Sequence, residues 1–148
     1  MTDFSALLTA RLRAANGLYL DLIDVLTPDL LTARLPGVRS APIWNQFWCV
    51  VGARESYVRW SRAGAWQGFA CSLERIEEPG EIRSALARSM DEATAWLRGL
   101  APDDEAGWGI AVHLLEHETQ HHGQLIRYLY GVPLPMPQSW IDAYALDT

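Results

Sequence analysis

Residues 103–131 read DDEAGWGIAVHLLEHETQHHGQLIRYLYG, and this stretch decides the fold. Its apolar side chains recur every three or four positions, which is the spacing of one face of a helix, as at Ile110, Leu114, Leu125 and Leu129. The acidic residues at its start favour the positive end of the helix dipole, and a terminal glycine commonly ends a helix. We therefore predict one long amphipathic helix over this stretch.

Three further stretches show the same helical spacing. They cover residues 3–26, about 42–63 and about 80–100. Gly64 and Pro102 follow the second and third of them, and both residue types interrupt helices. Four long amphipathic segments predict an all-α protein, a four-helix bundle in a single domain spanning residues 1–148.

The connecting segments predict a short extra helix and an extended tail. Residues 27–29, TPD, place an N-cap before a proline and an acidic residue, which is typical of a helix start. The apolar residues 66–73 are too few for a packed helix, and we expect a loop or strand-like segment covering one end of the bundle. Residues 132–137, VPLPMP, predict an extended C-terminal tail across the bundle. The long link between the second and third helices permits either a crossover or an up-and-down topology.

Composition excludes several classes of function. The net charge is −6 and the arginines are scattered singly, mostly on expected solvated faces, so we expect no nucleic-acid partner. All 12 basic residues are arginine, which excludes a lysine Schiff base and a Walker-type phosphate lysine. Two cysteines are too few for a disulfide framework, and no apolar run is long enough to cross a bilayer. We therefore expect a cytoplasmic protein with no membrane partner.

All histidines of the chain lie in the last predicted helix: His113, His117, His121 and His122. Helical spacing places Glu118 near the centre of the apolar face, with His121 beside it and His117 at its edge. Such buried polar groups need partners, because an unpaired buried charge is strongly unfavourable. Two imidazoles one turn apart can bind a single metal ion, and a hydrogen-bonded network without metal would also satisfy them.

The string HETQH at residues 117–121 also matches the H-E-x-x-H pattern of zinc proteases. That interpretation lacks the rest of the pattern. No histidine or glutamate follows His122 to supply a more distant third ligand, and no strands are predicted to frame the helix. We therefore do not adopt it.

The longer segment HETQHHGQL, residues 117–125, resembles the terminal-helix motif of the DinB-like superfamily. Members of that superfamily are four-helix bundles, and many hold nickel or zinc through one ligand from the second helix and two, a turn apart, from the last. The resemblance implies that His117 and His121 are metal ligands. The residue at the place of the usual second-helix histidine is Cys49, within WNQFWCVVG at residues 44–52.

Cys49 admits two interpretations. A thiolate binds zinc or nickel as well as an imidazole does, so Cys49 could complete the ligand set. A lone cysteine is also commonly a small buried apolar residue, and the metal site would then be lost. Cys49 belongs to a stripe of small or polar residues on the second helix, which either lines a cavity or permits close packing: Asn45, Cys49, Gly52, Ala53 and Ser56.

The resemblance implies a divalent-metal-dependent transferase or hydrolase that acts on a small-molecule substrate, with a low-molecular-weight thiol as the preferred nucleophile. Zinc or nickel is then the cofactor, and Glu118 is the catalytic residue, either as a base or by orienting a ligating histidine. The alternative is a non-catalytic, stress-associated protein with a degenerate metal site. Related bundles are often dimers, so we expect a homodimer.

Overall fold

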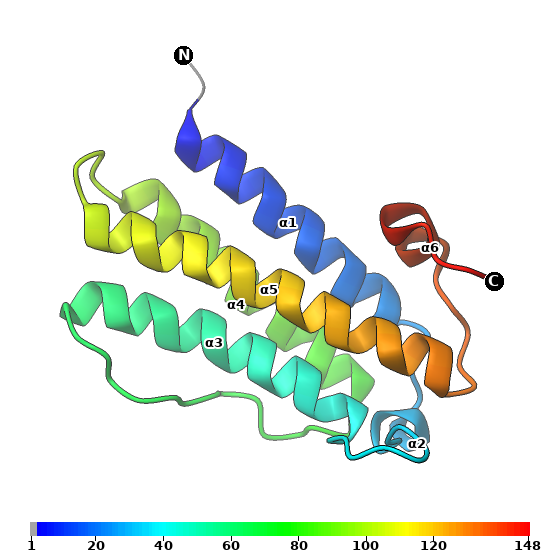
Figure 1. Ribbon diagram of the computed structural model, residues 1–148. Coiled ribbons are helices and arrows are strands. Elements are labelled where there is room, and N and C mark those ends of the chain that lie inside the picture. The colour runs from blue at the N-terminus through cyan, green and yellow to red at the C-terminus, as the bar shows by residue number, and fades with distance from the viewer. Residues whose placement is uncertain (1–2) are drawn as a thin grey trace.

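The computed structural model describes residues 3–148 and shows six helices, with no strand among those residues (Figure 1). Four helices are long: α1 (Phe4–Ile23), α3 (Ile43–Ala63), α4 (Pro79–Gly99) and α5 (Glu105–Gly131). Two are short: α2 (Pro28–Leu31) and α6 (Gln138–Tyr144). None of the described helices combines the length and the apolar character needed to span a bilayer.

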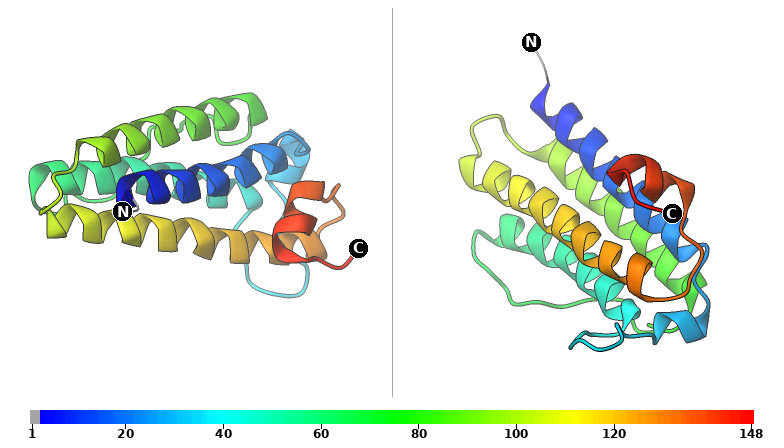
Figure 2. Two further views of the ribbon diagram at one scale, coloured as in Figure 1. Left: turned by 90° about the horizontal axis from the view of Figure 1, so that it is seen from above. Right: turned by 45° about the vertical axis from the view of Figure 1, so that its right-hand side comes forward.

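The four long helices pack side by side, and α1 and α3 each contact both α4 and α5. Helix α1 runs in the same direction as α5, and α3 in the same direction as α4, whereas α3 and α5 are antiparallel (Figures 1 and 2). Residues 64–78 return along the length of α3 before α4 begins, which is the crossover topology that the long link permitted. The prediction of an all-α protein with four long packed helices is confirmed.

Local caps explain why the predicted helix ends lie close to the observed ones. The Thr27 hydroxyl accepts a hydrogen bond from the backbone N–H of Leu30 at the start of α2. The Asp104 carboxylate does the same for Gly107 at the start of α5, at 2.8 Å. Gly64 ends α3 with a φ of +73°, a left-handed conformation that favours glycine. These signals lie within a few residues of each helix end and act on the local backbone, without a contact to another helix.

The segment 64–78 lies along the outer side of α3, so the prediction that it covers one end of the bundle is wrong (Figure 1). The Ser56 hydroxyl holds it by exchanging hydrogen bonds with the backbone N–H and carbonyl of Ala70, both at 3.1 Å. A Cβ atom on Gly52 would collide with the ring of Phe69. At these two positions the stripe of small residues therefore permits close packing and does not line a cavity.

The C-terminal segment is extended only to Pro137, and the helix α6 that follows it was not predicted. Trp140 of α6 is completely buried, and its indole N–H donates to the backbone carbonyl of Leu18 at 2.7 Å. Helix α6 thereby docks against α1 and α5 (Figure 2). A helix this short is unstable alone, so it depends on the burial of Trp140 rather than on a pattern visible in the sequence.

A buried ion pair lies at the centre of the bundle. Arg54 of α3 and Glu118 of α5 are both fully buried and form two parallel hydrogen bonds, at 2.6 and 2.9 Å. The same guanidinium also donates to the backbone carbonyl of Leu86, at 2.9 Å, and to the hydroxyl of Ser89, at 3.1 Å, both on α4. The sequence analysis placed Glu118 in the core but did not predict its partner.

Tyr19 connects α1 to this pair. Its hydroxyl donates to the backbone carbonyl of Glu118 at 2.6 Å, and its ring lies 5.7 Å from the guanidinium carbon of Arg54. Burial raises the pKa of Tyr19 well above its ordinary value, and the charge of Glu118 adds to the shift, so the phenol stays protonated and remains a donor. All four long helices therefore meet at one polar centre.

We expect Arg54→Met to destabilise the fold by about 3–5 kcal/mol, because it leaves the Glu118 carboxylate buried without a counter-charge. Urea unfolding followed by far-UV circular dichroism measures the change. The matched control is Arg13→Met, which removes an exposed pair with Asp91 and should cost about 1 kcal/mol or less. Adding Glu118→Leu to Arg54→Met should recover most of the loss, since no uncompensated charge remains. Equal costs for the two arginine substitutions would contradict this account of the core.

Candidate metal centre

Three potential metal ligands converge between α3 and α5. One donor atom from each of Cys49, His117 and His121 lies within 4.8 Å of the other two. The sulfur of Cys49 is 3.7 Å from Nε2 of His117, and the Nε2 atoms of His117 and His121 are 3.2 Å apart. The three residues that sequence and resemblance indicated as a ligand set are thus brought together by the fold.

These separations are close to the edges of a tetrahedral metal site. With zinc bonds of about 2.0–2.1 Å to nitrogen and 2.3 Å to sulfur, two nitrogen ligands lie about 3.3 Å apart, and nitrogen and sulfur about 3.6 Å apart. The observed separations of 3.2 and 3.7 Å differ from these by small amounts. Two of the three edges therefore match a tetrahedral site, and the third, between the Cys49 sulfur and a ring nitrogen of His121, lies within 4.8 Å. Three protein ligands would leave a fourth tetrahedral position open.

Gln46 sets the tautomer of His121. Its side chain is buried on α3, and its amide oxygen lies 2.6 Å from Nδ1 of His121. Because that oxygen can only accept, Nδ1 carries the hydrogen, and Nε2 presents its lone pair to Cys49 and His117. Metal-ligating histidines are commonly oriented by such a second hydrogen bond. Sequence reasoning missed Gln46, although its position three residues before Cys49 on one helix was an available signal.

His117 is held mainly by packing. Its Nδ1 atom is buried and has no hydrogen-bond partner among residues 3–148. Its ring lies 4.5 Å from the ring of His121 and 5.9 Å from that of Tyr57, measured between centroids. If Nδ1 carries the hydrogen, two Nε2 lone pairs face each other at 3.2 Å and require a cation between them. If Nε2 carries it, the two histidines form a hydrogen bond and Nδ1 remains an unsatisfied acceptor.

Burial keeps the three side chains uncharged at neutral pH. Desolvation, together with the nearby His117 and His122, lowers the pKa of His121 to about 4. Desolvation also lowers the pKa of His117, and it raises the pKa of the Cys49 thiol. Both imidazoles therefore have lone pairs free to bind a cation, whereas the thiol would have to release its proton.

Glu118, the predicted catalytic residue, is not free to act as a base in this structure. Both of its oxygens accept hydrogen bonds from Arg54, and its side chain is completely buried. Among the described residues, it makes no hydrogen bond to His117 or His121. Its catalytic role stays a prediction without geometric support, and what the structure shows is a contact that orients α5.

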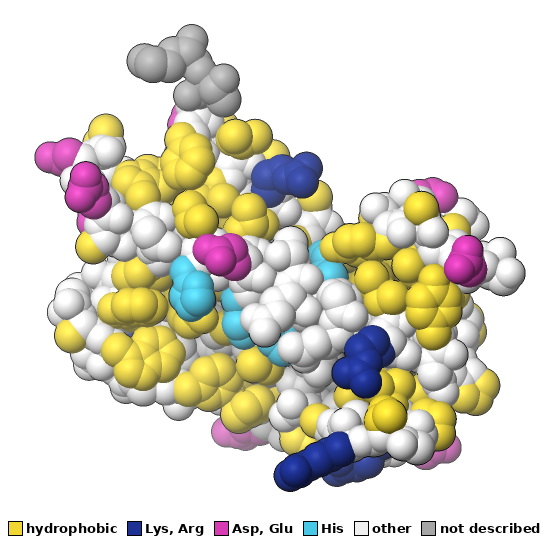
Figure 3. Space-filling view, in the orientation of Figure 1, with side chains coloured by type: hydrophobic (Ala, Val, Ile, Leu, Met, Phe, Trp, Pro, Cys, Tyr) yellow, Lys and Arg dark blue, Asp and Glu magenta, His cyan; other side chains and the backbone are white. Residues whose placement is uncertain are grey.

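The group of ligands is reachable from solvent. Histidine side chains gather on the face of the molecule shown in Figure 3, among hydrophobic side chains. Cys49 and His117 are half-buried, and His121 is buried. Tyr57 borders the group and stacks on the exposed His113, with ring planes 8° apart and centroids 5.2 Å apart. Cys49 and His117 are therefore more accessible to a small molecule than His121.

Comparisons with known proteins add no further support. No protein-family model matches the sequence, and a search of curated proteins finds no match. The interpretation of Cys49, His117 and His121 therefore depends on their own geometry and on the short motif around them.

We expect the metal-free protein to lose stability as the pH falls below about 6.5, the ordinary pKa of histidine. His121 has a folded-state pKa of about 4, so between these values the unfolded chain binds a proton that the folded chain does not. Urea unfolding at pH 7.5 and pH 5, with a chelator present, measures the difference. His121→Gln should reduce that difference by about 1 to 2 kcal/mol. An unchanged pH dependence in His121→Gln would show that His121 is not buried in its neutral form.

Proposed function

We propose that this chain binds one divalent transition-metal ion, zinc or nickel, through Cys49, His117 and His121. The observation that carries the proposal is the convergence of one sulfur and two imidazole nitrogens within 4.8 Å of one another, with two of the three separations at the spacing of tetrahedral ligands. Thiolate and imidazole are ligands that zinc and nickel favour. The hydrogen bond from His121 to Gln46 supports it further, because it leaves the ligating nitrogen unprotonated.

We further propose that the chain is a metal-dependent transferase or hydrolase of small molecules, related to the DinB-like superfamily. Three protein ligands with an open fourth position are typical of catalytic rather than structural zinc sites. A bound ion would supply a Lewis acid that lowers the pKa of a water or thiol. His113 lies one helical turn before His117 and is exposed, and in this proposal it accepts the proton of an entering nucleophile.

A low-molecular-weight thiol is the proposed nucleophile for the transferase. Its sulfur forms a bond to an electrophilic carbon of the second substrate, the bond from that carbon to the leaving group breaks, and the thiol proton passes to His113 and from there to solvent. In this proposal the buried Glu118 is a positioning residue, since Arg54 occupies both of its oxygens.

A non-catalytic, stress-associated protein with a degenerate site is the second candidate, and the contacts within the group favour it. Without an ion, the Nε2–H of His117 can donate to Nε2 of His121, with the sulfur of Cys49 beside it as a second, weak acceptor. The raised pKa of Cys49 keeps that thiol protonated. This arrangement holds the two imidazoles together with no metal and leaves only Nδ1 of His117 without a partner among the described ring nitrogens of the group, so metal analysis separates the two candidates.

The homodimer expected from the resemblance also remains a proposal. Apolar side chains exposed near the start of α1 and α5 would support it: Phe4, Leu7 and Val112. Hydrophobic side chains gather near this end of the molecule in Figure 3. Exposed apolar surface of this kind is often buried between protein subunits.

We expect protein purified without an affinity tag to carry about one zinc or nickel ion per chain and to lose it in His121→Ala. His113→Ala is the matched control, because His113 lies on the same helix outside the ligand group and should retain the ion. Cobalt-loaded protein should show a sulfur-to-cobalt charge-transfer band that disappears in Cys49→Ser and persists in Cys71→Ser. Metal-free protein whose stability does not respond to added zinc would favour the non-catalytic candidate.

Catalysis is tested separately on zinc-loaded protein. Consumption of a low-molecular-weight thiol in the presence of an electrophilic aryl halide should exceed the uncatalysed rate. The rate of thiol consumption should fall to the uncatalysed rate in His121→Ala. In His113→Gln it should be lower than in the unchanged chain but still above the uncatalysed rate. If the protein binds metal tightly but catalyses neither thiol consumption nor hydrolysis, the metal-site proposal stands and the enzymatic proposal is overturned.

We expect Gln46→Leu to weaken zinc binding about 10–100-fold, the usual effect of removing the hydrogen-bond partner of a ligating histidine. The amide oxygen that holds Nδ1 of His121 would be lost, and the imidazole would be free to adopt the other tautomer. Competition with a chromophoric chelator measures the affinity. Gln67→Leu is the matched control, since the one hydrogen bond of the Gln67 side chain within residues 3–148 goes to the backbone carbonyl of Ala65. Equal affinities in the two variants would mean that Gln46 does not position His121.

A further inference from the structure

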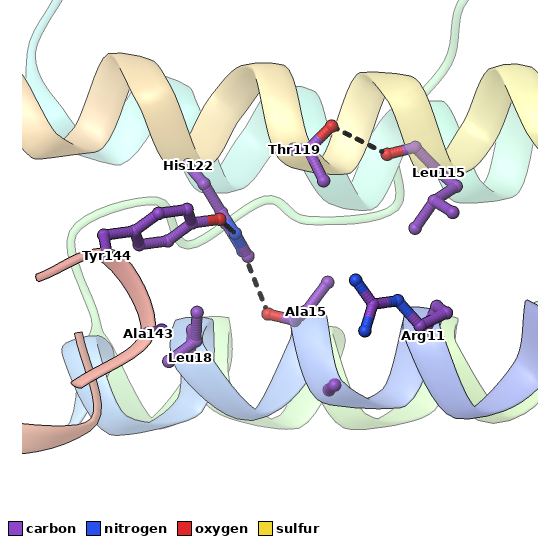
Figure 4. Close-up of a pocket in the computed structure, with 9 residues that line it drawn as sticks. Arg11, Ala15, Leu18, Leu115, Thr119, His122, Ala143 and Tyr144 are labelled. Carbon is purple, nitrogen blue, oxygen red and sulfur yellow. Dashed lines mark hydrogen bonds between the residues drawn. The ribbon is translucent and has the colours of Figure 1, made fainter.

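A cleft of about 430 Å³ lies between α1, α5 and α6 (Figure 4). It is on the α1 side of α5, whereas Cys49 and its partners are on the α3 side. Its volume is within the range of about 300–1,000 Å³ that small-molecule sites occupy. Alanine and leucine side chains form most of its wall, including Ala14 and Leu18 of α1 and Leu115 of α5.

Most polar hydrogens in the wall of the cleft are already donated within the protein. His122 donates from Nε2 to the backbone carbonyl of Ala15 at 3.1 Å, so its Nδ1 must accept. The Tyr144 hydroxyl donates to that Nδ1 at 2.6 Å (Figure 4). The Thr119 hydroxyl donates to backbone carbonyls of its own helix, including that of Leu115 at 3.2 Å. These groups offer lone pairs to the cleft but no hydrogens.

Arg11 is the exception among the lining residues. Its guanidinium extends into the space between α1 and α5 in Figure 4. Within residues 3–148 it has neither an ion-pair partner nor a hydrogen-bond acceptor, whereas Arg13 on the same helix binds Asp91 and Thr94. Burial raises the pKa of Tyr144, and the positive charge of Arg11 partly opposes that shift. The guanidinium on α1 therefore lies close enough to influence the Tyr144 hydroxyl on α6, across the cleft. The cleft thus combines apolar walls with one free cationic donor.

We propose that this cleft binds a small-molecule carboxylate with an apolar chain, with the carboxylate on Arg11 and the chain against Leu18 and Leu115. A guanidinium presents paired N–H donors that match a carboxylate, and such charge-assisted pairs are stronger than neutral hydrogen bonds. Arg11 is exposed, so water hydrates its guanidinium when the cleft is empty. A cationic ligand would be repelled by it, and an uncharged chain could not form the charge-assisted pair that a carboxylate forms. The free donor and the apolar wall therefore select an amphipathic anion.

Isothermal titration calorimetry of the full chain with octanoate tests the proposal. Saturable binding is expected, at least tenfold weaker in Arg11→Gln because the charge-assisted pair is lost. Arg88→Gln is the matched control, since it removes an exposed arginine of α4, away from the cleft, and should leave the affinity unchanged. Ala14→Phe places a ring in the cleft from an exposed position and should abolish binding.

Octanol and octyltrimethylammonium carry the same chain without a negative charge, and both should bind at least tenfold more weakly than octanoate. Circular dichroism establishes that each variant is folded. The proposal is overturned if millimolar octanoate does not bind, if Arg11→Gln or Ala14→Phe binds it as tightly as the unchanged chain, or if octanol binds equally well. Cys49→Ser should keep the octanoate affinity, so the outcome is independent of the proposed metal centre.

Discussion

The ion pair between Arg54 and Glu118 is the constraint on which the rest of the structure depends. Two charges removed from water are tolerated only when each satisfies the other, so this contact admits one register of α3 against α5. That register also places Cys49, five residues before Arg54, opposite His117, the residue before Glu118. The additional bonds from Arg54 to α4, and from Tyr19 to the Glu118 backbone, extend the same constraint to all four long helices.

Helix α5 presents different chemistry to its two neighbours. His121 and His122 are adjacent in sequence, but successive residues on a helix point about 100° apart, so the first faces Gln46 on α3 and the second faces Ala15 on α1. Glu118 lies between these two sides, and Arg54 neutralises its charge. This separation is why a candidate metal centre and a cleft for an amphipathic anion can share one helix.

Several features could not be predicted from the sequence because their signals are not local. Arg54 is one of twelve similar arginines, and nothing in its neighbourhood marks it as the buried partner of Glu118. The path of residues 64–78 follows from the space above Gly52, which Phe69 occupies. Helix α6 forms because Trp140 finds a buried position on other helices. In each case the deciding partner lies far away along the chain.

The sequence by itself determined the four long helices, their ends and the clustering of histidines on the last of them. Periodicity and capping act over a few residues, and so does the one-turn spacing that pairs His117 with His121. Only the tertiary structure decided that Cys49 faces that pair, that Gln46 sets the tautomer of His121 and that Arg11 lines a cleft with no ion-pair partner among residues 3–148. These outcomes depend on the register and direction of packed helices, which buried long-range contacts select.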